Sequence, residues 1–177
     1  MQIGPYKLYS IDTSEFALDG GAMFGIIPKP LWEKEVPADD KNRIQMVTRS
    51  LLLVSEENKI IIDTGNGSKW QEKFKDIYKI DLENLNLERS LGIYGFTPED
   101  ITDVYCTHLH FDHVGGNTKI VNGKLEPVFP NATYWVQTEN WDLANSPSEK
   151  DAGSFMSADW SVLLENNMIH FVDGKES

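Results

Sequence analysis

The chain has 177 residues, of which 40% are apolar, so it is long enough for one domain with a sizeable core. Its formal net charge of −12 argues against nucleic acid or an anionic membrane surface as a partner, because phosphate contacts require clustered Lys and Arg. The single cysteine, Cys106, excludes an internal disulfide and fits a small apolar residue in a buried strand. With no secretory signal pattern and no long apolar run, the sequence predicts a soluble, cytoplasmic protein.

The amino-terminal part predicts a strand followed by an apolar loop. Residues from Tyr6 to Asp12 alternate weakly, and Asp19-Gly20-Gly21 then breaks regular structure. The loop from Met23 to Pro30 carries more apolar side chain than a solvated loop should. It therefore packs onto the core, lines a ligand pocket or forms a partner surface.

The next segment predicts two strands of a buried sheet. Residues from Arg43 to Val54 alternate between apolar and polar and then become apolar on both faces. Ile60 to Ile62 predicts a short return strand that ends at Asp63. The carboxyl end of a strand is a frequent place for a functional site, but a turn-forming or helix-capping role for Asp63 is also open.

Two helices and a helical turn are expected between residues 68 and 100. The apolar residues of 68–79 recur at helical spacing, which predicts an amphipathic helix with its aromatic side chains in the core. A second helix is expected over 82–94, with Gly95 as its stop. Thr97 before Pro98 has the pattern of a cap on a short helical turn.

The strand expected over 101–107 leads into a segment that contains three of the four histidines. His108 and His110 are two residues apart, so an extended backbone would place both imidazoles on one side, where one cation could take both. A turn after them would point Asp112 and His113 at a second position nearby. The segment therefore predicts a metal site, with two adjacent metals plausible and Gly115-Gly116 allowing a tight or positive-φ exit.

Less specific explanations exist for this segment. A single histidine is usually an ordinary core or surface residue, but a cluster of imidazoles with a carboxylate is costly to bury without a ligand. A structural zinc site is usually rich in cysteine and coordinatively closed, whereas this chain has one cysteine. A metal centre that carries chemistry is the better interpretation.

The last part of the chain predicts further strands and helices. Asn122-Gly123 is a strong signal for a two-residue hairpin turn. His170 lies between apolar residues of the last expected strand, which favours a structural strand residue over a metal ligand. The other elements expected here are a strand at 132–136, a helix at 138–144, a helix from Ser157 and a strand at 168–172.

At this point the sequence resembles a known family. The pattern H-x-H-x-D-H is similar to the metal signature of the metallo-β-lactamase superfamily, and H-L-H-F-D-H-x-G-G looks most like its branch of N-acyl-homoserine lactonases and organophosphate hydrolases. Asp63-Thr64-Gly65 is similar to a second superfamily motif. The stretch from Leu18 to Trp32 looks like the amino-terminal loop of that branch. The resemblance covers essentially the whole chain.

For the fold, the resemblance implies an α/β protein with the four-layer αββα (α+β) arrangement of the superfamily. The superfamily also needs a further histidine, a bridging aspartate and a final histidine in its carboxyl-terminal half, and this sequence stops at Ser177. We therefore expect a single metallo-β-lactamase-like domain over residues 1–177, truncated at its carboxyl end and containing mainly the first half of the sandwich. Alone, such a chain should bind metal weakly, aggregate or pair with another molecule.

For the site, the resemblance implies two divalent metal ions, zinc before others. His108 and His110 would hold one ion, and Asp112 and His113 the other. Asp63 would orient a metal-binding histidine from behind. Substrate pocket residues expected from the same resemblance are Met23, Phe24 and Phe111.

For the activity, the resemblance implies hydrolysis by a metal-bound hydroxide, with Asp112 also passing a proton to the leaving group. A lactone or related ester is the first substrate class, and an organophosphate or aryl ester is the alternative within the same fold. A thioester or β-lactam fits less well. A non-catalytic metal-binding or interaction module is the alternative from another class, and a homodimer through Met23 to Trp32 is the expected protein partner.

Overall fold

A computed structural model describes residues 1–174 of the chain. Its centre is a mixed seven-stranded sheet in the order β1-β2-β3-β4-β5-β8-β9, antiparallel from β1 to β4 and parallel from β4 to β9. The strands β6 and β7 form a separate hairpin. The strands are β1 (Gln2–Ile3), β2 (Tyr6–Asp19), β3 (Arg43–Val54), β4 (Lys59–Ile62), β5 (Asp103–Tyr105), β6 (Thr118–Val121), β7 (Lys124–Pro127), β8 (Thr133–Gln137) and β9 (Ile169–Val172).

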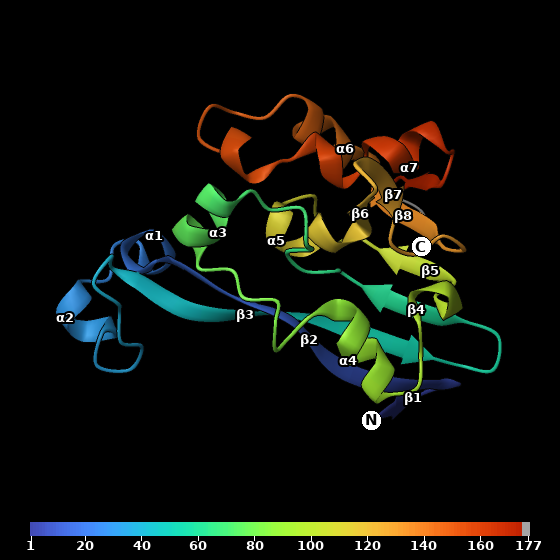
Figure 1. The fold of residues 1–177 in the computed structure, drawn as a ribbon, viewed down its shortest axis with the longest axis horizontal. Coiled ribbons are helices and arrows are strands. Elements are labelled where there is room, and N and C mark those ends of the chain that lie inside the picture. Colours follow the sequence, from blue (N-terminus) through green and yellow to red (C-terminus); the bar gives the residue numbers. More distant parts are fainter. Residues whose placement is uncertain (175–177) are drawn as a thin grey trace.

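Short helices α3, α4 and α5 lie over one face of this sheet (Figure 1). The helices are α1 (Gly20–Phe24), α2 (Lys29–Trp32), α3 (Glu72–Tyr78), α4 (Leu87–Ile93), α5 (Phe111–Val114), α6 (Thr138–Asn145) and α7 (Ser161–Glu165), with 3₁₀ turns η1 (Pro98–Asp100), η2 (Gly115–Asn117), η3 (Ala152–Ser154) and η4 (Ser157–Asp159). The expected α/β class is confirmed. Among residues 1–174, none of the helices has the length and apolar character needed to cross a membrane.

The core combines buried side chains of the sheet with buried side chains of α4, α5, α6 and α7. Strand register aligns Leu52, Ile61, Val104 and Tyr134 across four neighbouring strands, and all four side chains are fully buried. Because side chains alternate between the faces of a strand, this row and its neighbours form one continuous apolar layer. The layer supports the strand ends from which the histidine-rich segment emerges.

The opposite face of the sheet carries a second apolar row that the described residues do not cover. Leu51, Ile62, Tyr105, Trp135 and His170 are aligned by the register. Tyr105 is 41% exposed, and the Trp135 ring lies between those of Tyr105 and His170 at 5.4 and 4.5 Å. His170 is therefore a strand residue that packs on an aromatic neighbour, as expected. Residues 1–174 contain no second large sheet facing this row, which agrees with the expectation of mainly one half of a sandwich.

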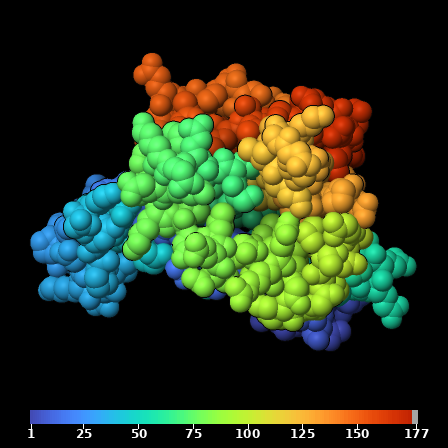
Figure 2. All heavy atoms as spheres, viewed as in Figure 1, coloured from blue at the N-terminus to red at the C-terminus, as the bar shows by residue number. Residues whose placement is uncertain are grey.

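The segment after β2 is more ordered than the loop predicted for it. The Asp19 carboxylate accepts a hydrogen bond from the Ala22 backbone N–H at 2.8 Å and so caps α1. Pro30 lies in the first turn of α2, where its missing N–H is tolerated. Phe24 stacks on Trp32 at 4.9 Å and joins the two helices. They form a projection at one end of the molecule (Figure 2), with Ile26 and Leu31 exposed, and the predicted homodimer through it stays a prediction.

The two central helices are shorter than predicted. The helix expected over 68–79 is reduced to α3, which has no buried residue, so the prediction of a core-facing aromatic stripe was wrong. Residues 64–71 are instead held against the histidine-rich segment in an irregular conformation, described below. The helix expected over 82–94 begins only after Asn86, whose side chain accepts from the Arg89 N–H. Residues 175–177 of the expected domain lie outside the described part of the chain.

Local signals predicted other elements well. The strand at Arg43–Val54 has the expected bounds. Thr97 and Asp100 form a reciprocal capping box around η1. Asn122 and Gly123 both have positive φ, at 50° and 79°, as the tight turn between β6 and β7 requires.

Candidate metal centre

The histidine-rich segment brings its three imidazoles together beside the parallel strands. His108 and His110 follow β5, with His110 in extended backbone, and α5 turns the chain so that Asp112 and His113 face back. The His108 ring lies 3.9 Å from the ring of His113 and 4.6 Å from that of His110, centroid to centroid. The spacing of the motif thus gives the convergence that it predicted.

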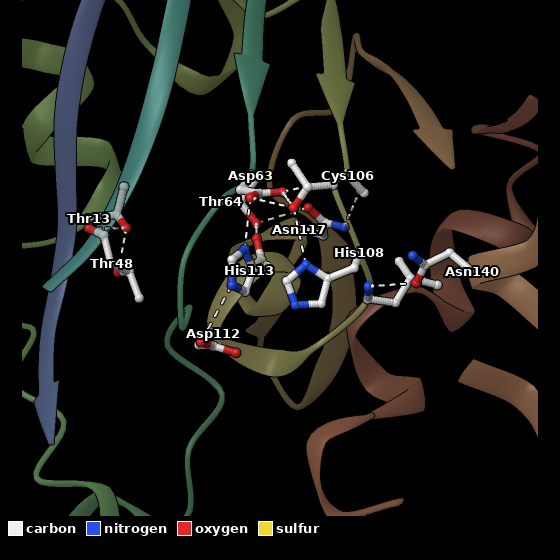
Figure 3. Close-up of polar contacts among 12 residues, drawn as sticks. Thr13, Thr48, Asp63, Thr64, Cys106, His108, Asp112, His113, Asn117 and Asn140 are labelled. Carbon is white, nitrogen blue, oxygen red and sulfur yellow. Dashed lines mark hydrogen bonds and ion pairs between the residues drawn. The ribbon is translucent and has the colours of Figure 1, made fainter. Parts of the chain in front are cut away.

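Asp63 connects two of these imidazoles to the end of β4 (Figure 3). Its Oδ2 lies 2.8 Å from His113 Nδ1, and its Oδ1 accepts from the Thr107 N–H at 2.9 Å. The Thr107 hydroxyl lies within 3.0 Å of both carboxylate oxygens and 3.1 Å from His108 Nδ1. Asp63 has a φ of 58°, a left-handed conformation that aspartate tolerates better than most residues.

These contacts select the tautomer of two imidazoles. A carboxylate only accepts hydrogen bonds, so the Nδ1–H of His113 donates to Asp63. The Thr107 hydroxyl has one proton, which it donates to Asp63, and its oxygen then accepts from the Nδ1–H of His108. In their neutral forms, both rings thus carry the free lone pair on Nε2, which is the form that binds a metal.

The same surroundings move the two histidine pKa values in opposite directions. Burial lowers the pKa of His108, and the neighbouring imidazoles of His113 and His110 lower it further. Burial also disfavours protonation of His113, but the hydrogen bond to Asp63 and the charge of Asp112 outweigh it and raise its pKa. His108 is therefore held neutral while His113 retains its proton to a higher pH.

The backbone of the segment interlocks with residues 64–67. The His113 carbonyl accepts from the N–H groups of Thr64 and Gly65 at 2.7 and 3.2 Å, and the Gly116 N–H donates to the Gly65 carbonyl. A Cβ on Gly115 would lie 2.2 Å from the Asn66 carbonyl oxygen. Gly115 and Gly116 do not have positive φ, so close backbone approach and not a left-handed path is what requires glycine there.

Cys106 lies directly behind this segment as a buried thiol. Burial raises its pKa to about 12, and the Asn117 side-chain amide donates to its sulfur at 3.6 Å. A thiol with so high a pKa stays protonated at neutral pH and is neither a good nucleophile nor a metal ligand. It is the small apolar residue that was predicted.

The three predicted pocket residues lie in different surroundings. Phe111, the first residue of α5, is only 6% exposed and packs against Trp70 and Tyr78, so it anchors α5 to these two side chains. Met23 is half-exposed and lines, with Tyr78, a cavity of about 480 Å³ between α1 and α3. Phe24 stacks on Trp32.

The donor atoms suit a divalent ion in kind, but they come in pairs. Imidazole and carboxylate are donors that zinc and similar ions take. The ring centroids of the expected pair His108 and His110 are 4.6 Å apart, and in the other expected pair His113 Nε2 lies 3.6 Å from Asp112 Oδ2. Among residues 1–174, no group of three or more His, Cys, Asp or Glu side chains is placed to hold one ion. Each expected ligand pair, His108 with His110 and Asp112 with His113, is therefore at most a half-site within the described residues, and its metal binding stays a prediction.

The family assignment rests on the match of a whole-family model. The model of the metallo-beta-lactamase superfamily matches residues 44–173, which include both β4 with Asp63 and the histidine-rich segment. The chain belongs to the metallo-beta-lactamase superfamily. Its relatives include an N-acyl homoserine lactonase of Bacillus cereus, 31% identical over 90 residues that make up 46% of this chain and 36% of that protein.

Solved structures of the superfamily share the fold. A probable metal-dependent hydrolase from Staphylococcus aureus is 30% identical with a TM-score of 0.84, over 98% of this chain and 61% of that one. The dizinc quorum-quenching lactonase AidC, crystallised with a product, is 22% identical with a TM-score of 0.74, over 100% of this chain and 61% of that one. The chain thus spans less than two thirds of the length of these relatives.

Some residues that build the site were not predicted from the sequence. Thr107 joins Asp63 to His108, and Thr64 donates through its hydroxyl to the Asn117 side chain at 2.9 Å. Lys69 contacts the backbone of the segment from the side. Thr107 and Thr64 each adjoin a residue that was singled out, which is a usable local signal, whereas nothing local marks Asn117 or Lys69.

Proposed function

We propose that this protein is a metal-dependent hydrolase, with lactones as the first choice of substrate class. The observation that carries the proposal is the convergence of three imidazoles, two of which Asp63 and Thr107 hold with Nε2 free. Imidazoles that converge in this way suit a metal ion, because the neutral ring is a strong metal ligand. Membership of the metallo-beta-lactamase superfamily supports the same reading.

We assign two divalent ions to the site, with zinc as the first choice because a dizinc lactonase shares the fold. His108 and His110 hold one ion, and Asp112 and His113 hold the other. When bound, such ions lower the pKa of water toward neutrality and polarise the oxygen of the scissile group. Asp63 does not bind the metal itself but accepts a hydrogen bond from the His113 ring and keeps that ring in its metal-binding tautomer.

Asp112 has a second role in the proposal. Its carboxylate is partly exposed and lies 3.6 Å from His113 Nε2. A carboxylate in this position can take a proton and deliver it to a leaving alkoxide. Metal ligation and proton transfer would compete for the same two carboxylate oxygens of Asp112.

The substrate class rests on analogy and on one cavity. Sequence relatives are named N-acyl homoserine lactonases, and a lactone such as an acyl-homoserine lactone is our first choice. The cavity beside Met23 has apolar side chains of Ile77 and Tyr78 that could receive an acyl chain. An organophosphate or aryl ester is the alternative, because the same donors can activate water against phosphorus.

Replacing a ligand tests the assignment. In the complete gene product, His108→Ala and Asp112→Ala should each lower turnover by orders of magnitude, because each removes a donor of a different pair. His170→Ala is the matched control, since His170 packs on Trp135 in β9. Steady-state kinetics on a lactone, a phosphotriester, a thioester and a β-lactam would identify the substrate class, and near-normal turnover of His108→Ala would refute the assignment.

A non-catalytic metal-binding or interaction module is the second candidate. It is favoured by the absence, within residues 1–174, of a three-donor group, and by the uncovered apolar row of the sheet. Elemental analysis of the purified gene product distinguishes the two. Close to two metal ions per chain supports the hydrolase, whereas no metal together with a stable stoichiometric complex supports the module.

A further inference from the structure

Lys69 is a buried cation beside the candidate metal centre that no step above uses. Its side chain is 9% exposed, and its Nζ lies 3.0 Å from Asp159 Oδ1, whose side chain is 2% exposed. The same Nζ donates to the backbone carbonyls of Gly115 and Thr118. Gly115 lies in the turn η2 that follows α5, and Thr118 is the first residue of β6.

The three acceptors show that this group works as an ammonium ion. An ammonium has three N–H donors, and Asp159, Gly115 and Thr118 take one each, whereas a neutral amine has only two. Burial lowers the pKa of Lys69 and raises that of Asp159, and the attraction between the two charges opposes both shifts. The close contact between the two groups thus keeps both of them charged.

Stabilisation of the fold is a poor explanation for this pair. A buried ion pair often contributes less than an apolar pair of similar size would, because both charges lose their hydration. Asp159 Oδ2 is buried, and no protein donor among residues 1–174 reaches it. The surroundings are largely apolar, since the small cavity of about 130 Å³ at this place is lined by Trp70, Phe74 and Met156.

The position of the pair suggests another purpose. On one side, Lys69 holds the turn at Gly115, two residues after His113, whose carbonyl is already fixed by Thr64 and Gly65. On the other side, Asp159 closes η4, and the segment before η4 covers His110. Phe155 forms a β-bridge with His110, and their rings lie 4.7 Å apart.

We propose that Lys69 is a positioning residue that fixes the His113 half-site relative to the segment that covers the His110 half-site. Its ammonium group joins the two through Asp159 and the carbonyls of Gly115 and Thr118. The proposal rests on the metal centre proposed above. Lys69, in the turn between β4 and α3, thereby connects three separate segments through its Nζ atom.

The test replaces the whole pair so that no charge is left unpartnered. In the double variant Lys69→Met/Asp159→Leu, two apolar side chains of similar size face a largely apolar cavity, so the fold should be retained. The tie to Gly115 and Thr118 is lost. Lys119→Met is the matched control, because it removes a lysine from an exposed ion pair with Glu88 next to the same turn.

Two measurements on the complete gene product decide the proposal. In the metal-free protein, amide hydrogen exchange of Thr64, Gly65 and Gly116 should be several-fold faster in the double variant, with exchange in β3 and β4 unchanged. In a Co²⁺ titration, the affinity of the double variant for Co²⁺ should be about 10- to 100-fold lower than that of the wild type, and its d–d absorption spectrum should change. Losses of this size are typical when a residue that orients a metal ligand is replaced. Lys119→Met should match the wild type in both.

Unchanged exchange at the three amides would overturn the proposal, and so would an equal rise throughout the chain, since the pair would then only stabilise the fold. Wild-type Co²⁺ affinity and spectrum in the double variant would overturn it as well. If the wild type takes up no Co²⁺, the proposed metal centre fails, while the exchange measurement still decides whether Lys69 positions the turn.

Discussion

Asp63 determines how the histidines of the site are presented. Its Oδ1 accepts from the Thr107 N–H, and its Oδ2 accepts from both the Thr107 hydroxyl and the His113 ring. Asp63 follows the last residue of β4 and has a left-handed backbone conformation. It lies opposite Thr107, which follows Cys106 just after the end of β5. The orientation of two imidazoles therefore depends on a single side chain from a neighbouring strand.

Asp63→Asn should leave the shape of this network but remove its charge. The His113 pKa, which the hydrogen bond to Asp63 raises, should then fall, because burial remains and its main opposing contact is weakened. NMR titration of the histidine ring protons in the metal-free protein measures this. Co²⁺ affinity at neutral pH should drop by about 10- to 100-fold.

Asp12→Asn is the control for this change, since Asp12 forms an exposed ion pair with Arg49 on the sheet. It should affect neither the His113 titration nor the Co²⁺ affinity. An unaltered His113 pKa in Asp63→Asn would show that the carboxylate does not hold the ring in solution. The stability contribution has a defined sign as well: protonated His113 stabilises the fold below its unfolded pKa, and this contribution is lost as pH rises through its raised folded pKa.

At the scale of elements, the site is an interlock between two turns. The turn after β4 and the turn after α5 exchange backbone hydrogen bonds and approach so closely that side chains are excluded. A Cβ at Gly67 would lie 2.0 Å from the Gly115 carbonyl oxygen. The interlock fixes residues 64–67 in an irregular path before α3.

Gly115→Ala should therefore destabilise the protein strongly. The added methyl group meets a backbone carbonyl that has its own hydrogen bonds to lose, and overpacking of this kind costs about 1–3 kcal/mol or more. Gly92→Ala is the matched control, because Gly92 lies within α4 with open space at its Cβ position. That variant should gain up to about 1 kcal/mol from helix propensity.

Urea unfolding of the two variants measures both changes. The two substitutions add the same methyl group to a glycine with ordinary helical backbone, so any difference between them reports on the surroundings. Equal stability of Gly115→Ala and the wild type would mean that the two turns are further apart in solution than in the structure.

At the scale of the whole molecule, the sheet has one covered and one open face. The helix-covered face buries a continuous apolar layer, whereas the row that includes Tyr105 and Trp135 is partly exposed. Exposed apolar rows of this kind mark surfaces that another element or molecule covers. The segment that carries the proposed metal ligands His108, His110, Asp112 and His113 follows β5 of this sheet.

We expect the isolated 177-residue chain to bind zinc with an affinity weaker than nanomolar. Two donors per ion are fewer than the three or four of a typical protein zinc site, so each ion keeps much of its water shell. Competition with a chromophoric chelator measures the affinity. Nanomolar zinc binding by this chain would contradict the reading of two half-sites.

The sequence by itself determined what depends on neighbours in the chain. Strand β3, the Asn122-Gly123 turn and the Thr97 cap follow from local periodicity and local hydrogen bonds. The pair His108 and His110 follows from the alternation of an extended backbone. Through its spacing and the resemblance that it carries, the motif also identified the superfamily.

Only the tertiary structure decided what depends on contacts between distant segments. It joined Asp63 to His113 across 50 positions and Lys69 to Asp159 across a still longer separation, and it shortened the helix expected at 68–79 to α3. Such contacts leave no periodic trace, because each involves a single side chain or carbonyl whose partner is brought near by the sheet. The kind of chemistry was therefore readable from a short motif, whereas the groups that hold its ligands in place were not.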